Sequence, residues 1–132
     1  MSEFIKDISF EIPNIQSFVM LGKEIANYSL NFNIKSNSYK KNIIAVDTLL
    51  KIAPNQDVKH KILTEITCTT LVSIEEHFKD KKELEKIILI KVPNEIYPTL
   101  YETFVYLFKQ AGIKNIEIHK KVDFEKMYNE KK

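Results

Sequence analysis

The residue types that most often carry catalysis or metal binding are few in this chain and lie far apart. They are three histidines, one cysteine and one pair of glutamates: His60, His77, His119, Cys68, Glu75 and Glu76. The histidines fall in separate predicted elements, without the close spacing that is typical of zinc ligands. The cysteine has no neighbouring histidine or second cysteine, so we interpret it as a small buried hydrophobic residue and not as a nucleophile.

Acid–base and phosphate chemistry are equally poorly supported. Glu75 and Glu76 are adjacent on a segment predicted to be extended, so their side chains face opposite ways and are poor catalytic partners. The two glycines, Gly22 and Gly112, cannot build a glycine-rich phosphate loop. We therefore predict no catalytic residues and no metal site, and we expect that the chain is not an enzyme.

Three carboxylates fall on two predicted strands. Asp7 and Glu11 share one face of the strand at residues 4–12, about 13 Å apart at roughly 3.3 Å per residue. Glu65 lies beside Leu63 on one face of a later strand. If these strands pair, the carboxylates flank one apolar side chain on a sheet surface that could receive a basic segment of a partner. The alternative is an ordinary solvated sheet face.

Apolar side chains gather in the connection at residues 13–27, which shows neither helical nor strand periodicity. They are Ile15, Phe18, Val19, Leu21 and Ile25. The aromatic-rich strand at 28–34 follows directly, and three tyrosines lie partly off the main apolar stripe of a later helix: Tyr97, Tyr101 and Tyr106. Because so small a domain cannot bury every apolar side chain, this region predicts a long groove or an oligomer interface. The alternative is that it all belongs to the core.

Alternation of apolar and polar residues predicts the strands that must position these side chains. It favours strands at residues 4–12, 28–35, 42–53 and 58–76. Pro13, a turn at Asn37 and Ser38, and a turn beginning at Pro54 separate them. On the last strand Ile62, Thr64, Ile66 and Cys68 share one face.

The period changes to that of helices after residue 76. Asp80 and Glu83 have the spacing of a capping box for a helix that stops near Pro93. Asn94 can cap the next helix, with Pro98 near its first turn. That helix carries one apolar stripe: Ile96, Leu100, Phe104, Leu107, Phe108 and Ala111.

The end of the chain predicts a helix stop, a short extended segment and a last helix. Gly112 suits the stop, residues 113–118 the extended return, and Asp123 can cap the last helix. Four strands followed by helices indicate the α+β class, with helices packed on one side of a four-stranded antiparallel sheet. We predict one domain over residues 1–132.

Length and composition limit the class further. With 132 residues, of which 44% are hydrophobic, the chain can bury one modest core. Twenty basic and 18 acidic residues give a net charge of +2, which offers no reason to expect nucleic acid or a membrane surface as partner. No secretory signal or membrane-length apolar run is visible. A single cysteine suits a reducing compartment, so we expect a cytoplasmic protein.

Short segments along the chain resemble, in order, those of the SecB family, the bacterial chaperones that hold preproteins unfolded for export. These are residues 6–14 and 62–66, the pairs Pro93-Asn94 and Tyr97-Pro98, and residues 122–124. The resemblance implies a four-stranded antiparallel sheet with a crossover between its first two strands, helices on one side, and neither cofactor nor nucleotide. It also implies a homotetramer, built as a dimer of dimers, whose apolar grooves bind unfolded polypeptides without ATP.

The resemblance also implies which residues bind partners. The acidic sheet surface of the family receives the basic, zinc-containing tail of SecA, the export motor, and by position this contact falls on Asp7, Glu11, Leu63 and Glu65. The client groove would involve the crossover and the second strand, hence Phe18, Leu21, Tyr28, Leu30 and Phe32.

Two other functions fit the same residues. One is a SecB-like chaperone dedicated to a single partner, such as an antitoxin; the slightly basic charge of this chain, where SecB proteins are usually strongly acidic, is compatible with it. The other is a small-ligand or lipid-binding protein that uses one closed apolar pocket.

Overall fold

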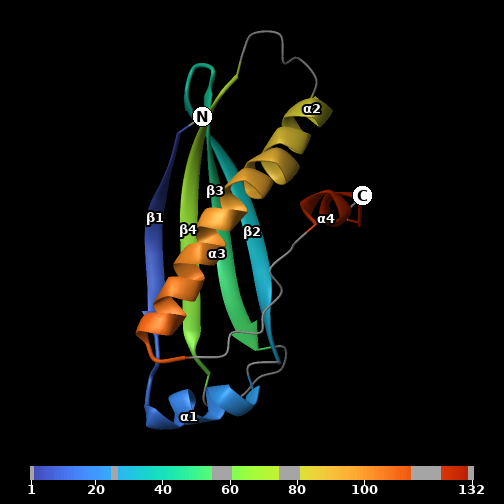
Figure 1. The fold of residues 1–132 in the computed structure, drawn as a ribbon. Helices are drawn as coiled ribbons and strands as arrows, with labels where there is room; N and C mark the ends of the chain where they lie inside the picture. Colours follow the sequence, from blue (N-terminus) through green and yellow to red (C-terminus); the bar gives the residue numbers. More distant parts are fainter. Residues whose placement is uncertain (1, 25–26, 55–60, 75–80, 114–122, 131–132) are drawn as a thin grey trace.

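Four strands and a long helical segment make up most of the structure, a computed structural model that describes residues 2–24, 27–54, 61–74, 81–113 and 123–130. The elements in chain order are β1 (Ser2–Glu11), α1 (Ile15–Glu24), β2 (Tyr28–Lys40), β3 (Ile43–Pro54), β4 (Leu63–Ser73), α2 (Lys81–Lys86), the π-helix η2 (Ile87–Lys91), α3 (Val92–Gln110) and α4 (Phe124–Glu130). Figure 1 shows α3 crossing the sheet diagonally and α1 lying at one end of it.

The strands form one antiparallel sheet in the order β1-β4-β3-β2. The chain therefore crosses from one edge of the sheet to the other between β1 and β2, and α1 lies in this crossover. The α+β prediction, with helices on one side of a four-stranded antiparallel sheet, is confirmed. The strands that carry Asp7 and Glu65 pair directly, which fulfils the condition on which the shared strip of carboxylates depended.

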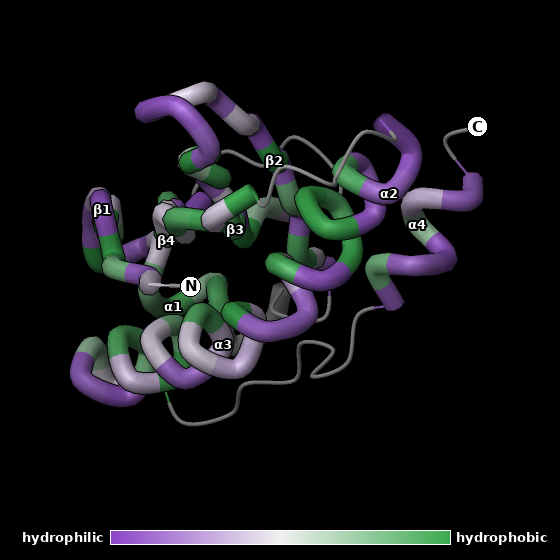
Figure 2. The backbone as a smooth tube through the Cα atoms, turned by 90° about the horizontal axis from the view of Figure 1, so that it is seen from above, coloured by the Kyte–Doolittle hydropathy of each residue, from purple (hydrophilic) through white to green (hydrophobic). Residues whose placement is uncertain are grey.

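The core lies between α3 and the sheet face that it covers. Alternate residues of β3, of β4 and of the position just before β4 point into it, as the strand period requires: Val46, Leu50, Ile52, Ile62, Ile66 and Cys68 are all buried. Opposite them, the apolar stripe of α3 buries Ile96, Leu100, Phe104 and Phe108. Seen from above in Figure 2, α3 lies against one side of the sheet, and none of the helices that the structure describes lies against the opposite side.

The segment after β1 is helical, so the prediction of an irregular connection at residues 13–27 was wrong. Asn14 begins the helix: its Oδ1 accepts hydrogen bonds from the backbone N–H of Ser17 at 2.9 Å and from the Ser17 hydroxyl at 3.1 Å. These bonds satisfy a donor that every helix start leaves unpaired. Within α1, Leu21 is buried in the core, whereas Ile15 is exposed to solvent.

The hairpin between β2 and β3 is longer than predicted. We placed a turn at Asn37 and Ser38, but β2 pairs with β3 as far as Lys40, opposite Ile43. The turn falls at Lys41 and Asn42 instead, where Asn42 has a φ of 68°. Asparagine tolerates this left-handed conformation better than most residues, which explains why the reversal occurs there.

The helical segment does not stop at Pro93, contrary to prediction. It runs from Lys81 to Gln110 through α2, η2 and α3. A proline ring normally clashes with the carbonyl four residues before it. Here the chain widens into a π-turn, with the Val92 N–H bonded to the Ile87 carbonyl, and Pro93 stands in the first turn of α3. Asn94 therefore caps no helix, and Pro98 lies inside α3.

The predicted helix ends at Gly112 and Asp123 agree with the structure. Gly112 has a φ of 91°, and the Lys126 N–H donates to Asp123 Oδ1 at 3.0 Å. The capping role of Asp80, the extended return at 114–118 and the outer ends of the strand predicted at 58–76 lie outside the described residues. Among the described residues, no helix has both the length and the apolar character needed to cross a membrane.

A buried tyrosine links the start of β2 to the residue before β4. The Tyr28 hydroxyl accepts a hydrogen bond from the Ile62 N–H at 3.1 Å, and both residues are buried. Tyr28→Phe should leave this N–H unpaired and lower the free energy of unfolding by about 1–3 kcal/mol. Chemical denaturation of the two proteins measures this, and an unchanged midpoint would show that water reaches the Ile62 N–H.

Candidate partner-binding and client-binding surfaces

The sheet face turned away from α3, here called the outer face, is formed by alternate residues of its strands. In β1, β4 and β3 these include Asp7, Ser9, Glu11, Leu63, Glu65, Thr67, Asp47, Leu49 and Lys51. Within the described ranges, Figure 1 and Figure 2 show no helix on this face. The described helices therefore leave the outer face open to an extended or helical partner.

The register of β1 and β4 brings together all the residues predicted for partner binding. Glu11 is opposite Leu63, Ser9 is opposite Glu65, and Asp7 is opposite Thr67. Directly opposite residues of an antiparallel pair lie on the same face, with Cβ atoms about 4.5–5.5 Å apart. The three carboxylates thus lie along one strip of the outer face, with Leu63 43% exposed between them.

Lysines accompany these carboxylates. Lys51 Nζ lies 3.7 Å from Glu65 Oε1, and Lys6 Nζ lies 3.4 Å from Asp47 Oδ2. Asp7 and Glu11 have no such ion pair among the described residues. The negative charge available to a basic partner is therefore concentrated at these two carboxylates, because a lysine already neutralises part of the charge of Glu65.

Sequence reasoning missed Asp47 and Lys51 as members of this face. Asp47 accepts hydrogen bonds from the Thr69 hydroxyl at 2.7 Å and from Lys6 Nζ. The alternation within residues 42–53 was sufficient to place both side chains opposite the buried Val46 and Leu50. Only the pairing of β3 with β4, however, shows that they lie beside Glu65.

The residues predicted for the client groove lie at different depths. Leu21 and Tyr28 are buried, Leu30 and Phe32 are half-buried, and Phe18 is 40% exposed. Leu21 and Tyr28 therefore belong to the core of the chain and would support a groove from beneath. Phe18 offers the largest exposed apolar surface of the five.

Phe32 lies under α4. Its ring makes edge-to-face contacts with Phe124 at 5.0 Å and with Tyr97 at 5.7 Å between centroids. The Tyr128 hydroxyl donates to Glu85 Oε2 at 3.1 Å, which ties α4 to α2. Access to Phe32 therefore depends on the position of α4.

A hollow on the exposed side of α3, here called the α3 pocket, is lined mainly by aromatic and aliphatic side chains. Its members are Tyr97, Pro98, Tyr101, Glu102, Val105, Tyr106 and Lys109. Tyr106 is 62% exposed, while burial raises the pKa of Tyr97 to about 12. The pocket thus presents an apolar floor, a Tyr97 hydroxyl that stays protonated at neutral pH, and a rim with one acidic and one basic side chain, Glu102 and Lys109.

The α3 pocket is connected to α1 through the end of α3. The Phe18 ring lies 3.7 Å from the point where a side chain at Gly112 would begin. Phe18 and the last turns of α3 are therefore neighbours. This contact places the Phe18 side of α1 at the end of α3, whereas the α3 pocket is lined by residues of α3.

No catalytic arrangement accompanies these surfaces in the part of the chain that the structure describes. Within those residues no group of histidine, cysteine and carboxylate side chains could hold a metal ion. Burial raises the pKa of the Cys68 thiol, with a further contribution from the charge of Glu3. A raised pKa disfavours the thiolate that a nucleophile requires.

Comparison with known proteins identifies the family. The family model described as preprotein translocase subunit SecB matches residues 1–132. Over 131 residues the chain is 39% identical to a protein of Pelagibacter ubique (strain HTCC1062) provisionally named protein-export protein SecB, covering 99% of this chain and 94% of that protein.

A solved structure supports the fold. It is the SecB-like chaperone of Mycobacterium tuberculosis in complex with a ChAD peptide from an antitoxin. The TM-score is 0.51 at 16% sequence identity, and the match covers 83% of this chain and 84% of that chain. At this identity the likeness concerns the fold alone.

These findings define the class of the protein as a chaperone of protein export and not an enzyme. The chain belongs to the SecB family. The resemblance predicted from residues 6–14, 62–66 and the proline pairs is confirmed.

Proposed function

We propose that this chain is an ATP-independent holdase that binds unfolded polypeptides on its helical side and delivers them to the export motor SecA through the outer face. The observation that carries the proposal is the set of large apolar side chains left exposed on α1 and at the α3 pocket. Ile15 is 82% exposed, Val19 53% and Tyr106 62%. Apolar side chains exposed together typically mark binding sites for proteins or peptides.

Clients would bind by several weak contacts. An unfolded chain presents apolar side chains at irregular intervals, and open hollows accept them without a fixed register. Each contact contributes little alone, but linked contacts on one chain bind at a high effective concentration. The α3 pocket and the exposed side of α1 would be two such contact points.

The SecA contact would use the outer face. Asp7, Glu11, Leu63 and Glu65 lie on one strip there, on the opposite side of the sheet from the α3 pocket. A client and the basic tail of SecA could therefore bind at the same time. This separation suits a protein that must hold one chain while it docks to another.

A dedicated chaperone is the second candidate function. It is favoured by the structural likeness to a SecB-like chaperone solved with an antitoxin peptide and by the lysines that neutralise part of the outer face. Co-purification from the native host with identification of the bound chains separates the two. Many unrelated preproteins support the general holdase, and one recurrent partner supports the dedicated chaperone.

Closed-pocket binding of a small ligand has less support. The hollow beside β1, which Ile8 lines, is open to solvent. The α3 pocket, which Tyr101 lines, is open as well. Small-ligand sites usually bury most of the ligand surface. Family membership also favours polypeptide binding over this alternative.

Assembly is the first test of the proposal. We expect the purified protein to form a homotetramer, a dimer of dimers, or at least a dimer, because apolar side chains remain exposed on the edge strand β1 and on α1. Ile5 is 36% exposed, Ile8 44% and Ile15 82%. Light scattering at micromolar concentration measures the mass. A stable monomer would contradict this expectation and the groove geometry that depends on it.

A further inference from the structure

An irregularity in β1 changes which of its side chains reach the outer face. The pairing of β1 with β4 shifts between Ile5 and Asp7, so that Lys6 is the extra residue of a β-bulge. Beyond the bulge, Phe4 is opposite Thr69 and Ile5 is opposite Cys68. Simple alternation would group Phe4 with the inward-facing Ile8, but the bulge turns Phe4 to the outer face.

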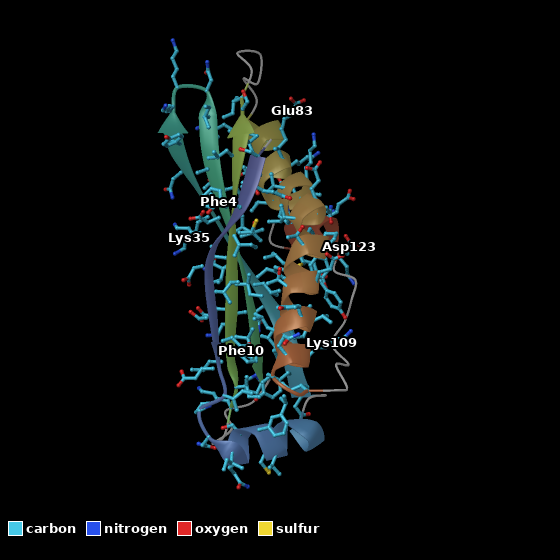
Figure 3. The ribbon with its side chains drawn as sticks, turned by 60° about the vertical axis from the view of Figure 1, so that its left-hand side comes forward. Phe4, Phe10, Lys35, Glu83, Lys109 and Asp123 are labelled. Atoms are coloured by element: carbon cyan, nitrogen blue, oxygen red, sulfur yellow. The ribbon has the colours of Figure 1, made fainter. Side chains whose placement is uncertain are left out.

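Phe4 is an exposed aromatic side chain beside partly buried apolar neighbours. It is 51% exposed and lies opposite Thr69; its diagonal neighbour on the outer face is Leu71, which is opposite Ala45. Figure 3 shows Phe4 and Lys35 on the side of the sheet opposite Lys109 of α3. This end of the outer face therefore offers an apolar contact at Phe4 and Leu71 next to polar and charged side chains, whereas the end that carries Glu11 and Glu65 is mainly charged.

The bulge also determines which charge near Phe4 is available to a partner. Because Lys6 and Asp7 both point to the outer face, Lys6 can reach Asp47 at 3.4 Å while Asp7 stays outside that pair. Asp47 also accepts a hydrogen bond from the Thr69 hydroxyl, and Lys35 lies opposite it on β2. The charge of Asp47 is therefore already engaged by groups of this chain. Asp7 is thus the carboxylate beside Phe4 that can receive a cation from outside.

We propose that the basic partner segment of the outer face carries an apolar side chain that binds against Phe4 and Leu71, next to a cation that pairs with Asp7. The inference rests on the outer-face docking proposed above and specifies its partner. The residues opposite Phe4 and Asp7, Thr69 and Thr67, are two positions apart on β4. That is about 7 Å at roughly 3.4 Å per residue.

This spacing determines the chemistry of the partner. Two positions in an extended chain cover the same distance, and one turn of a helix covers about 5.4 Å. A segment with an apolar residue and a lysine or arginine at either spacing matches the pair. A purely basic segment would leave Phe4 and Leu71 in contact with water and would gain nothing from this end of the face.

Phe4→Ser tests the apolar contact at Phe4, here called the Phe4 anchor. The probe is the zinc-loaded tail peptide of SecA from the same organism. We expect the substitution to weaken binding about fivefold, as expected for loss of one moderate interface contact. The loss should be the same at low and high salt, because an apolar contact is not screened, whereas the loss caused by Asp7→Asn should shrink as salt rises. Phe4→Leu should retain most of the affinity.

Tyr39→Ser is the matched control, since Tyr39 is also an exposed aromatic residue, 59% exposed, and lies in the β2–β3 hairpin away from Phe4 and Asp7. It should bind the tail like wild type. Equal binding by Phe4→Ser and wild type overturns the anchor and leaves the outer-face docking intact. A smaller assembly of Phe4→Ser by light scattering also overturns it, because Phe4 then belongs to a contact between copies. No binding by wild type overturns the SecA docking itself.

Discussion

Phe18→Ser combined with Tyr106→Ser should weaken the holding of an unfolded client about thirtyfold, if each exposed aromatic contributes roughly 1 kcal/mol to binding. Phe18 is 40% exposed at the end of α1, and Tyr106 is 62% exposed at the α3 pocket. Neither side chain lies in the core, so the fold should survive. Leu21 and Tyr28 are unsuitable for this test because they are buried, and their loss would lower stability directly.

Client holding is measured as the concentration of protein that halves the aggregation of a chemically unfolded protein, without ATP. The matched control is Phe4→Ser combined with Tyr39→Ser, which removes two aromatics of similar exposure, 51% and 59%, from the outer face and the β2–β3 hairpin. Equal loss in both double variants would show that general surface hydrophobicity matters and that the α1 and α3 surface is not the client site.

Asp7→Asn combined with Glu11→Gln should weaken binding of the SecA tail about thirtyfold at low salt, as expected for two charge contacts at an interface. Neither carboxylate has an ion pair among the described residues. Loss of such charges should mainly slow association. The difference from wild type should shrink as salt rises, because exposed charges are screened over about 10 Å at 0.1 M ionic strength.

Glu65→Gln should have the smaller effect of the outer-face variants, because Lys51 lies 3.7 Å from that carboxylate. Lys51→Met is the complementary test: it should tighten tail binding by releasing the charge of Glu65. Both are measured by titration with the same peptide. If Glu65→Gln costs more than the Asp7 and Glu11 pair, the lysines do not control the availability of charge on this face. Client holding should be unchanged in every one of these variants.

Much of the sheet could be predicted because its information is local. The alternation around Ile62 and Ile66 reports which side chains face the core, and the register then follows from antiparallel pairing of complete strands. The faces of β1 and β4 that carry Asp7, Glu11, Leu63 and Glu65 were therefore predictable, whereas the pairing that joins them into one strip was only a condition. The crossover between β1 and β2 came from family resemblance, since neighbouring strands in sequence usually pair directly.

The errors arose where one local interaction overrides a pattern. α1 is short, and its start depends on the Asn14 side chain bonded to Ser17, which weak periodicity does not reveal. Pro93 is compatible with a continuing helix only because the preceding π-turn, closed by the Val92 N–H, relieves its clash. The bulge at Lys6 left no mark on the sequence, although it decides that Phe4 faces outward.

The sequence indicated which residue types form the candidate binding sites, but it did not indicate which of those side chains are buried and which are exposed. Phe18, Leu21 and Tyr28 are similar as apolar residues in a sequence, yet only Phe18 remains partly exposed once α1 packs against the end of α3. Likewise, Lys51 and Asp47 join the outer face only through the β3–β4 register. Burial and neutralisation depend on contacts between distant segments.

The most direct test of the holdase is complex formation between the purified protein and a chemically unfolded preprotein, without nucleotide, followed by light scattering coupled to gel filtration. We predict a stable complex with wild type and with the double variant Asp7→Asn plus Glu11→Gln. The double variant Phe18→Ser plus Tyr106→Ser should form a much weaker complex. Failure of wild type to retain any unfolded chain would contradict the account.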